Sequence, residues 1–208
     1  AAAMMLQGMT SQYLLKSSYA VTAGDTILVM AAAGGVGQIL CQWARHLGAN
    51  VIGCVGSELK AEIARAAGCN HTILYSSEDV AARVLDITSG RGVPVSYDSV
   101  GQATLQASLD SLAPTGTLIS FGNASGPILD LNPGMLAAGG SLYLQRPTLA
   151  TYTRNRELLE AVSEDLLDVV RSGKVKINVG QTYPLSDAVR AHRDLEGRKT
   201  TGSAVLLP

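Results

Sequence analysis

A run of small residues, Ala31-Ala32-Ala33-Gly34-Gly35-Val36-Gly37, has the clearest chemical use in this sequence. It follows a short apolar run, Thr26–Met30, and precedes an amphipathic helical pattern. Aligned to GxGxxG, it has alanine at the first glycine position and glycine at the other two. A side chain at the second glycine would hold the backbone away from a pyrophosphate, and one at the third would push the helix from the strand. Because a helix N-terminus attracts phosphate, we predict a dinucleotide site at Gly34, Gly35, Val36 and Gly37; a glycine-rich turn without a ligand is the alternative.

The residues after the next apolar run, 51–55, bear on the choice of dinucleotide. Enzymes selective for NAD commonly place Asp or Glu there to hold the ribose hydroxyls, but no acid directly follows this run. Ser57 could donate a hydrogen bond to a 2′-phosphate, and Lys60 could supply positive charge. Glu58 is an acid, although at a helix start it can serve the helix dipole. We therefore predict NADPH over NADH, with a solvated Lys60 as the alternative.

Further candidates lie where the remaining predicted strands end, because ligands of doubly wound sheets bind outside the carboxyl ends of the strands. A tyrosine after the third strand could cover the adenine, and a phenylalanine after the fifth should lie towards the nicotinamide. Arginines can hold phosphate bidentately. These candidates are Tyr75, Ser99, Phe121, Gly122, Asn123, Arg146 and Arg198. A half-buried core tyrosine and solvated arginines are the alternatives.

The sequence between Thr26 and Leu144 alternates apolar runs with helical patterns, and short joints containing glycine separate them. This alternation is typical of βαβ units. The predicted strands are Thr26–Met30, 51–55, 71–75, 94–98, 116–121 and 141–144, and the helices between them include 58–67, 79–88 and one carrying Leu105, Leu109 and Leu112. We predict an α/β fold with a doubly wound, parallel, six-stranded Rossmann sheet.

Beyond residue 147 the pattern changes. A long helix is predicted over Arg156–Arg171, then a strand at 175–179, a short helix after Ser186 and a last strand at 204–207. We therefore expect three parts: a connecting helix at 1–20, the Rossmann domain at 21–147, and a C-terminal segment at 148–208. The first residues read as the middle of an apolar helix, and we expect the chain to be part of something larger.

The composition excludes several classes of protein. Of 208 residues, 47% are hydrophobic and 16% charged, with a formal net charge of −1, which fits a sheet buried on both faces. Scattered Lys and Arg argue against nucleic-acid binding, and no apolar stretch reaches the ~18 residues of a membrane span. Three isolated cysteines and the absence of a signal peptide indicate a cytoplasmic protein with reduced thiols and no structural zinc.

Several segments together resemble the quinone oxidoreductase branch of the medium-chain dehydrogenase/reductase superfamily. They are residues 31–37, 41–44, 95–101, 120–126, 140–144, 183–185 and 191–192. The resemblance covers essentially the whole chain. It implies that Ser57, Lys60 and Tyr75 surround the adenosine 2′-phosphate and that Tyr13, Phe121, Arg146 and Arg198 also contact the cofactor.

The resemblance also implies parts that this chain lacks. A GroES-like catalytic domain would precede Ala1, and the segment from about Thr148 would complete it. Leu6 stands where zinc-dependent relatives carry a cysteine ligand, which implies zinc-free hydride transfer from NADPH to a quinone-like small molecule by positioning alone. No side chain is assigned as a catalytic acid or base. The family further implies a homodimer through the edge strand at 141–144.

Four other functions are alternatives to this prediction. The chain could be a nucleotide-binding module without catalysis, or an enoyl or alkenal reductase of the same superfamily. A short-chain dehydrogenase is disfavoured because no Tyr-x-x-x-Lys occurs. A methyltransferase is disfavoured because the first strand ends in Val29-Met30 rather than in an acid.

Overall fold

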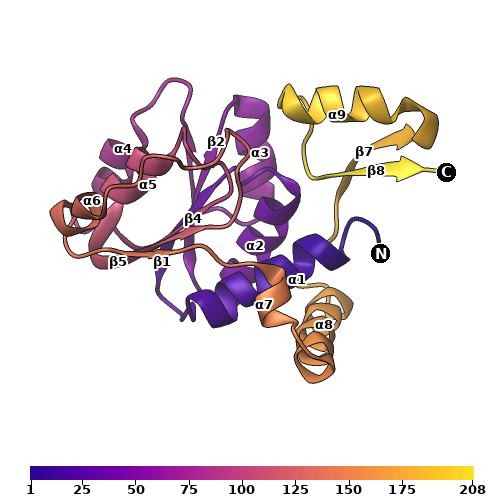
Figure 1. The fold of residues 1–208 in the computed structure, drawn as a ribbon, viewed down its shortest axis with the longest axis horizontal. Coiled ribbons are helices and arrows are strands. Elements are labelled where there is room, and N and C mark those ends of the chain that lie inside the picture. Colours follow the sequence, from indigo (N-terminus) through magenta and orange to yellow (C-terminus); the bar gives the residue numbers. More distant parts are fainter.

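A parallel six-stranded sheet forms the centre of the computed structural model, which describes all residues from Ala1 to Pro208. The strand order is β3-β2-β1-β4-β5-β6. This order reverses direction between β1 and β4, as in a doubly wound sheet, and confirms the predicted fold class (Figure 1). The strands are β1 (Thr26–Met30), β2 (Asn50–Val55), β3 (His71–Leu74), β4 (Val93–Asp98), β5 (Leu112–Ser120) and β6 (Tyr143–Gln145).

Helices cover both faces of the sheet. Successive residues of a strand point to opposite faces, so neighbouring residues of β1 contact different helices. Ile27 packs with α1 (Met5–Tyr13), α2 (Gly35–His46) and α3 (Glu58–Ala66). Its neighbour Leu28 packs with α4 (Val80–Ile87) and α5 (Leu105–Asp110), beside the short helix α6 (Pro133–Ala138). The central strand β1 is therefore apolar and buried from Ile27 to Met30, as expected where helices cover both faces of a parallel sheet.

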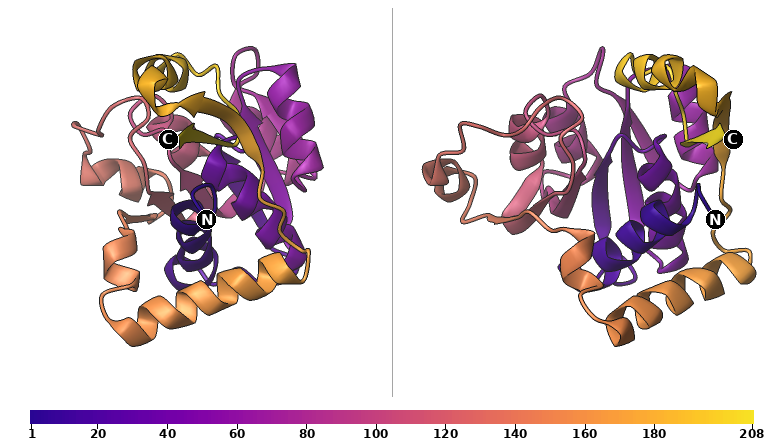
Figure 2. Two further views of the ribbon diagram at one scale, coloured as in Figure 1. Left: turned by 90° about the vertical axis from the view of Figure 1, so that its right-hand side faces the viewer. Right: turned by 45° about the vertical axis from the view of Figure 1, so that its right-hand side comes forward.

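The N-terminal helix α1 continues into a π-helical turn, Leu14–Ser18. The buried Tyr97 of β4 donates from its hydroxyl to the Leu14 carbonyl at 3.2 Å and so fastens this turn to the sheet. Helix α8 (Arg156–Arg171) packs across α1 (Figure 2). The two helices lie so close that a Cβ on Gly8 would come within 2.6 Å of Leu166 Cδ2.

The last part of the chain forms a separate two-stranded parallel sheet of β7 (Val179–Pro184) and β8 (Ser203–Leu207). A 3₁₀ turn, Leu185–Asp187, and α9 (Ala188–Glu196) connect them. Helix α7 (Leu149–Tyr152) precedes α8. Parallel sheets are normally buried on both faces, yet Leu207 of β8 is 50% exposed. The connection is exposed as well: Leu185 of the turn is 57% exposed and Val189 of α9 is 64% exposed.

Three predicted elements differ from the structure. Residues 175–178 form no strand: the Lys176 N–H donates to the side-chain oxygen of Gln42 at 2.9 Å, so β7 begins only at Val179. Leu112 belongs to β5 and not to the preceding helix, which ends at Asp110. Buried leucines look alike in both elements, so apolar spacing alone did not separate them.

The sixth strand begins two residues later than predicted. Ser141 has a left-handed backbone, with φ of +60°, which breaks an extended strand. The Leu142 N–H donates to the Leu136 carbonyl at 2.9 Å and therefore serves the end of α6. No helix of the structure is long and apolar enough to cross a membrane.

Candidate functional site

The glycine-rich turn joins β1 to α2 at the carboxyl end of the sheet. Its first residue, Ala31, has a left-handed backbone with φ of +55°, and its carbonyl accepts the Gly34 N–H at 2.9 Å. A Cβ on Gly37 would lie 2.7 Å from the Ala32 carbonyl oxygen and closer still to that of Ala31. Gly37 therefore allows α2 to approach β1, which is the role that the sequence predicts for the third glycine.

The first turn of α2 leaves backbone N–H groups free. Gly34 is the N-cap and offers no side chain to accept them, and the first N–H groups of any helix lack an acceptor within it. The Gly35 N–H faces the Gly202 carbonyl in the parallel bridge between Gly34 and Gly202. The free amides are those of Val36 and Gly37, and the positive end of the helix dipole lies with them. The turn can therefore bind an anionic group such as a pyrophosphate.

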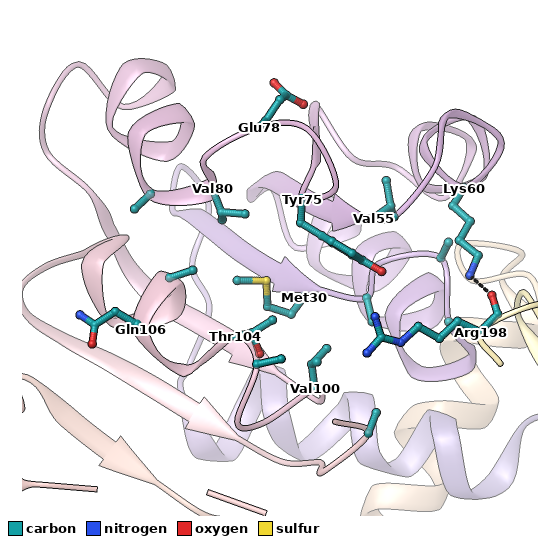
Figure 3. A pocket seen from close by; sticks show the side chains of 18 of the residues that line it. Met30, Val55, Lys60, Tyr75, Glu78, Val80, Val100, Thr104, Gln106 and Arg198 are labelled. Carbon is teal, nitrogen blue, oxygen red and sulfur yellow. Dashed lines mark hydrogen bonds between the residues drawn. The ribbon is translucent and has the colours of Figure 1, made fainter. Parts of the chain in front are cut away.

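A cleft of about 600 Å³ opens directly in front of this turn. Met30, Tyr75, Val100 and Arg198 line it (Figure 3), and Gly34 of the turn also belongs to its lining. The loops after β1, β2, β3 and β4 all contribute, and so does the segment after α9. The size and the mostly apolar lining with a few polar groups are typical of a small-molecule or cofactor site.

One wall of the cleft carries two positive charges. Lys60 Nζ donates to the Arg198 carbonyl at 2.6 Å, while the Arg198 guanidinium reaches into the cleft below the Tyr75 hydroxyl (Figure 3). Burial, and then the nearby charge of Arg198, lower the pKa of Lys60. Such a pair favours an anionic ligand, because a negative charge between the cations relieves their repulsion.

The residues around this wall also make contacts within the chain. Ser57 does not line the cleft; it is the N-cap of α3, and its hydroxyl accepts the Lys60 N–H at 3.4 Å. Glu58 pairs with Arg65 at 2.9 Å, so its carboxylate is already neutralised. Gly56 lets the Tyr75 ring lie across the end of β2, since a Cβ there would be 2.8 Å from Tyr75 Cζ.

Sequence reasoning missed Asp98, which shapes the loop after β4. This carboxylate is 2% exposed and accepts from the Val100 N–H at 2.7 Å and the Gly101 N–H at 3.0 Å. It also accepts from the hydroxyls of Thr104 at 2.6 Å and Ser108 at 2.7 Å. An acid that ends a buried strand before Ser-Val-Gly is the signal that could have revealed it.

The predicted residues after β4 and β5 lie against each other and outside the cleft. A Cβ on Gly122 would lie 2.8 Å from Ser99 Cα, so the two loops touch through backbone. Arg146 Nη1 donates to the Ser120 carbonyl at 2.8 Å. When the Asn123 amide is oriented to satisfy its neighbours, its oxygen accepts from Arg146 Nη2 at 3.3 Å.

Tyr13 and Tyr152 form a second aromatic cluster near Arg146. The Tyr13 ring stacks on Tyr152, with centroids 4.4 Å apart and planes 5° from parallel. Burial, then Tyr152, raise the pKa of Tyr13 to about 12, and Arg146 acts in the opposite direction. Phe121 is half-buried and packs against the same core. Sequence reasoning missed Tyr152 because α7 lies outside the predicted Rossmann domain.

The predicted site residues thus separate into two groups. Gly34, Lys60, Tyr75 and Arg198 line one cleft. Tyr13, Phe121, Asn123 and Arg146 gather at the β5–β6 end of the sheet. The three cysteines are free and buried, and no group of three or more His, Cys, Asp or Glu side chains is placed to hold a metal ion.

Comparison with protein families finds that residues 35–165 match the model described as zinc-binding dehydrogenase. Over its whole length the chain is 51% identical to a quinone oxidoreductase of Pseudomonas aeruginosa, of which it covers 64%. It is 50% identical to a 2-haloacrylate reductase of a Burkholderia species, of which it covers 62%.

Solved structures agree with these relatives. The crystal structure of Escherichia coli quinone oxidoreductase complexed with NADPH matches all of this chain with a TM-score of 0.98 at 47% identity. The chain covers 64% of that protein. It therefore spans slightly less than two-thirds of the length of these relatives.

Proposed function

The chain belongs to the zinc-binding dehydrogenase family, within the quinone oxidoreductase branch of the medium-chain dehydrogenase/reductase superfamily, and from this premise we propose that it is the cofactor-binding part of an NADPH-dependent quinone reductase. The observation that carries the proposal is the cleft in front of the glycine turn, with Lys60 and Arg198 on one wall. A dinucleotide with an additional phosphate is the ligand that this combination of features favours.

The residues present fit NADPH. The amides at the start of α2 would hold the pyrophosphate, and the absence of a Cβ at Gly34 leaves room for its approach. Lys60 and Arg198 would hold the 2′-phosphate, and Tyr75 would cover the adenosine. When bound, NADPH supplies a hydride to an electrophilic acceptor.

The nicotinamide end would be supported by the second group of residues. Arg146 is held by the Ser120 carbonyl, and Tyr13 is held by its stack on Tyr152. Phe121 and Asn123 follow β5 directly and would limit the access of water. No side chain among them is proposed as an acid or base; their role would be to position the cofactor.

We propose that the reaction needs no zinc. Leu6 stands at the position that the family resemblance aligns with a cysteine ligand, and its alkyl side chain is 62% exposed. A quinone is already electrophilic and does not require a Lewis acid. Elemental analysis of the purified protein is expected to find no stoichiometric zinc, and one tightly bound zinc per chain would contradict the proposal.

We also propose that residues 148–208 complete a catalytic domain whose remainder lies outside this chain. The relatives are longer than the chain, and the apolar side chains of Leu185, Val189 and Leu207 are at least half exposed. A partner domain would bury them. In that arrangement 1–20 connects the two parts and 21–147 binds the dinucleotide.

A homodimer through β6 is the proposed assembly. Tyr143 on this edge strand is 64% exposed, and α9, which contacts β7 and β8, does not cover it. The Leu142 N–H is bonded within the chain and cannot pair with a second copy, so the test is placed at Tyr143. Tyr143→Lys puts a charge on the edge and should yield a monomer. Sedimentation of the unmodified chain as a monomer at micromolar concentration would contradict the proposal.

The 2-haloacrylate reductase relative supports a second candidate, the reduction of an activated carbon–carbon double bond. We would follow NADPH oxidation with 1,4-benzoquinone, 2-chloroacrylate and an enone, using both this chain and the chain extended to the length of its relatives. The proposal expects the quinone to be reduced fastest by the extended protein. Faster reduction of either alkene would favour the second candidate. Cofactor binding without turnover by the extended protein would identify a binding module.

A further inference from the structure

The segment 197–203, here called the C-terminal strap, crosses in front of the glycine turn. At one end the Gly202 N–H donates to the Ala33 carbonyl at 2.9 Å, and Gly34 and Gly202 form a parallel bridge. At the other end Lys60 Nζ donates to the Arg198 carbonyl at 2.6 Å. The strap is thus fastened to the turn and to α3, on both sides of the phosphate site.

The backbone of Arg198 needs this support. Its φ of +56° lies in the left-handed region, which a non-glycine residue adopts only at a cost in energy. At the end of α9 the Arg198 N–H donates to the Leu195 carbonyl at 3.0 Å, and the Lys199 N–H donates to the Asp194 carbonyl at 2.9 Å. The Arg198 carbonyl points the other way and accepts from Lys60. Lys60 therefore helps to hold the conformation that directs the guanidinium into the cleft (Figure 3).

Lys60 and Arg198 differ from the neighbouring Lys199 in whether their charge has a carboxylate partner. Lys199 pairs with Asp194 at 3.5 Å. Neither Lys60 nor Arg198 forms an ion pair with a carboxylate in the structure. The positive charge of Arg198 also contributes to the lowered pKa of Lys60. Two close, unpaired cations on one wall are arranged to receive an anion.

We propose that Lys60 is a positioning residue for phosphate selectivity: through the Arg198 carbonyl it holds the strap so that the Arg198 guanidinium faces the 2′-phosphate. The proposal rests on the NADPH function proposed above and deepens it. It assigns Lys60 a second role besides its own charge. It also implies that a ligand with a 2′-phosphate stabilises the strap, whereas a ligand without it does not.

The first test uses two small probes of the adenosine end, adenosine 2′,5′-bisphosphate and adenosine 5′-monophosphate. Calorimetry would measure both affinities for the unmodified chain and for Lys60→Met, Arg198→Met, the double variant and the control Lys199→Met. Arg198→Met should weaken the bisphosphate roughly tenfold, since it removes one charge-assisted contact. Lys60→Met should weaken it further, because it removes its own contact and also releases the strap that directs Arg198. The double variant should bind about as weakly as Lys60→Met, because the contact of Arg198 is already lost in that single variant. The monophosphate and Lys199→Met should change by less than about twofold.

The second test examines the hydrogen bond from Lys60 to the Arg198 carbonyl in the absence of any ligand. Amide hydrogen exchange within 197–203 should be several-fold faster in Lys60→Met than in the unmodified chain or in Lys199→Met. Unchanged exchange together with additive losses of affinity would overturn the positioning role and leave only a direct contact. Equal binding of the two probes by the unmodified chain would instead overturn the proposed NADPH function. Because exchange in the free chain does not depend on the probes, the two failures are distinguishable.

Discussion

The two ends of the cofactor region differ in how far this chain completes them. At the proposed adenosine end, Lys60 and Arg198 line an open cleft of about 600 Å³ and form no ion pair with a carboxylate. At the β5–β6 end, Arg146 and Tyr13 already have partners, a carbonyl and a stacked ring. The first end is ready to receive a ligand, while the second is packed against its own chain.

The difference follows from which elements build each end. The adenosine end uses the loops after β1 to β4 and the strap after α9. The β5–β6 end takes Tyr13 from α1 and Tyr152 from α7. In the sequence, α1 precedes the first strand of the sheet and α7 follows the last one. We therefore expect this chain to bind the cofactor by itself, whereas the proposed function assigns the chemistry to a catalytic domain that it only partly contains.

The largest effect is expected from Asp98→Ala, which should damage both ends. The change removes a buried carboxylate from four donors, among them the Val100 N–H at 2.7 Å and the Ser108 hydroxyl at 2.7 Å. Leaving buried donors without acceptors should lower the free energy of unfolding by about 3 kcal/mol. Denaturant unfolding would measure this. Asp110→Ala, which removes an exposed acceptor of Gln106, is the control, and an equal loss there would contradict the role of Asp98.

A smaller and more selective effect is expected from Gly37→Ala. The added Cβ would lie 2.7 Å from the Ala32 carbonyl oxygen, so α2 must move away from β1, at a cost of about 2 kcal/mol. NADPH and NADH should both bind at least about tenfold more weakly in calorimetry, because both present a pyrophosphate. Gly134→Ala in α6 is the matched control, since its Cβ meets only the Asn132 side chain and helix propensity favours alanine. Unchanged affinity in Gly37→Ala would mean that the pyrophosphate binds elsewhere.

The smallest effect would separate the two ends directly. Arg146→Met removes the contact with the Ser120 carbonyl at 2.8 Å and should weaken NADPH several-fold. Adenosine 2′,5′-bisphosphate should bind as before, because it lacks the nicotinamide half. Parallel calorimetric titrations of both ligands check this. A loss of the same size for both ligands would show that the ends are not independent.

Local patterns predicted the fold well because short stretches of sequence determine it, and they also led to residues that line the cleft. The glycine spacing placed Gly34 and Gly37 at the turn, and the residues after the second strand placed Lys60 on the cleft wall. Arg198 was found through a basic turn and a family resemblance. Ser57 was predicted as a ligand donor but caps α3. Helix caps and phosphate ligands share the same residue types at the same position.

What the sequence did not reveal depends on contacts between distant segments. The stack of Tyr13 on Tyr152 joins residues on α1 and α7, and the tie of Lys60 to Arg198 joins α3 to the strap. The shifted β6 has a related cause, since the left-handed Ser141 and the bond from Leu142 to Leu136 reflect the end of α6. No periodicity within a short stretch of sequence encodes such pairings.

The most direct test of the central claim is calorimetric titration of the unmodified 208-residue chain with NADPH and with NADH. The unpaired Lys60 and Arg198 on the cleft wall predict that NADPH binds at least about tenfold more tightly, because only NADPH carries the 2′-phosphate. The same difference should separate adenosine 2′,5′-bisphosphate from adenosine 5′-monophosphate. Equal affinities for NADPH and NADH, or no binding of either, would contradict the account.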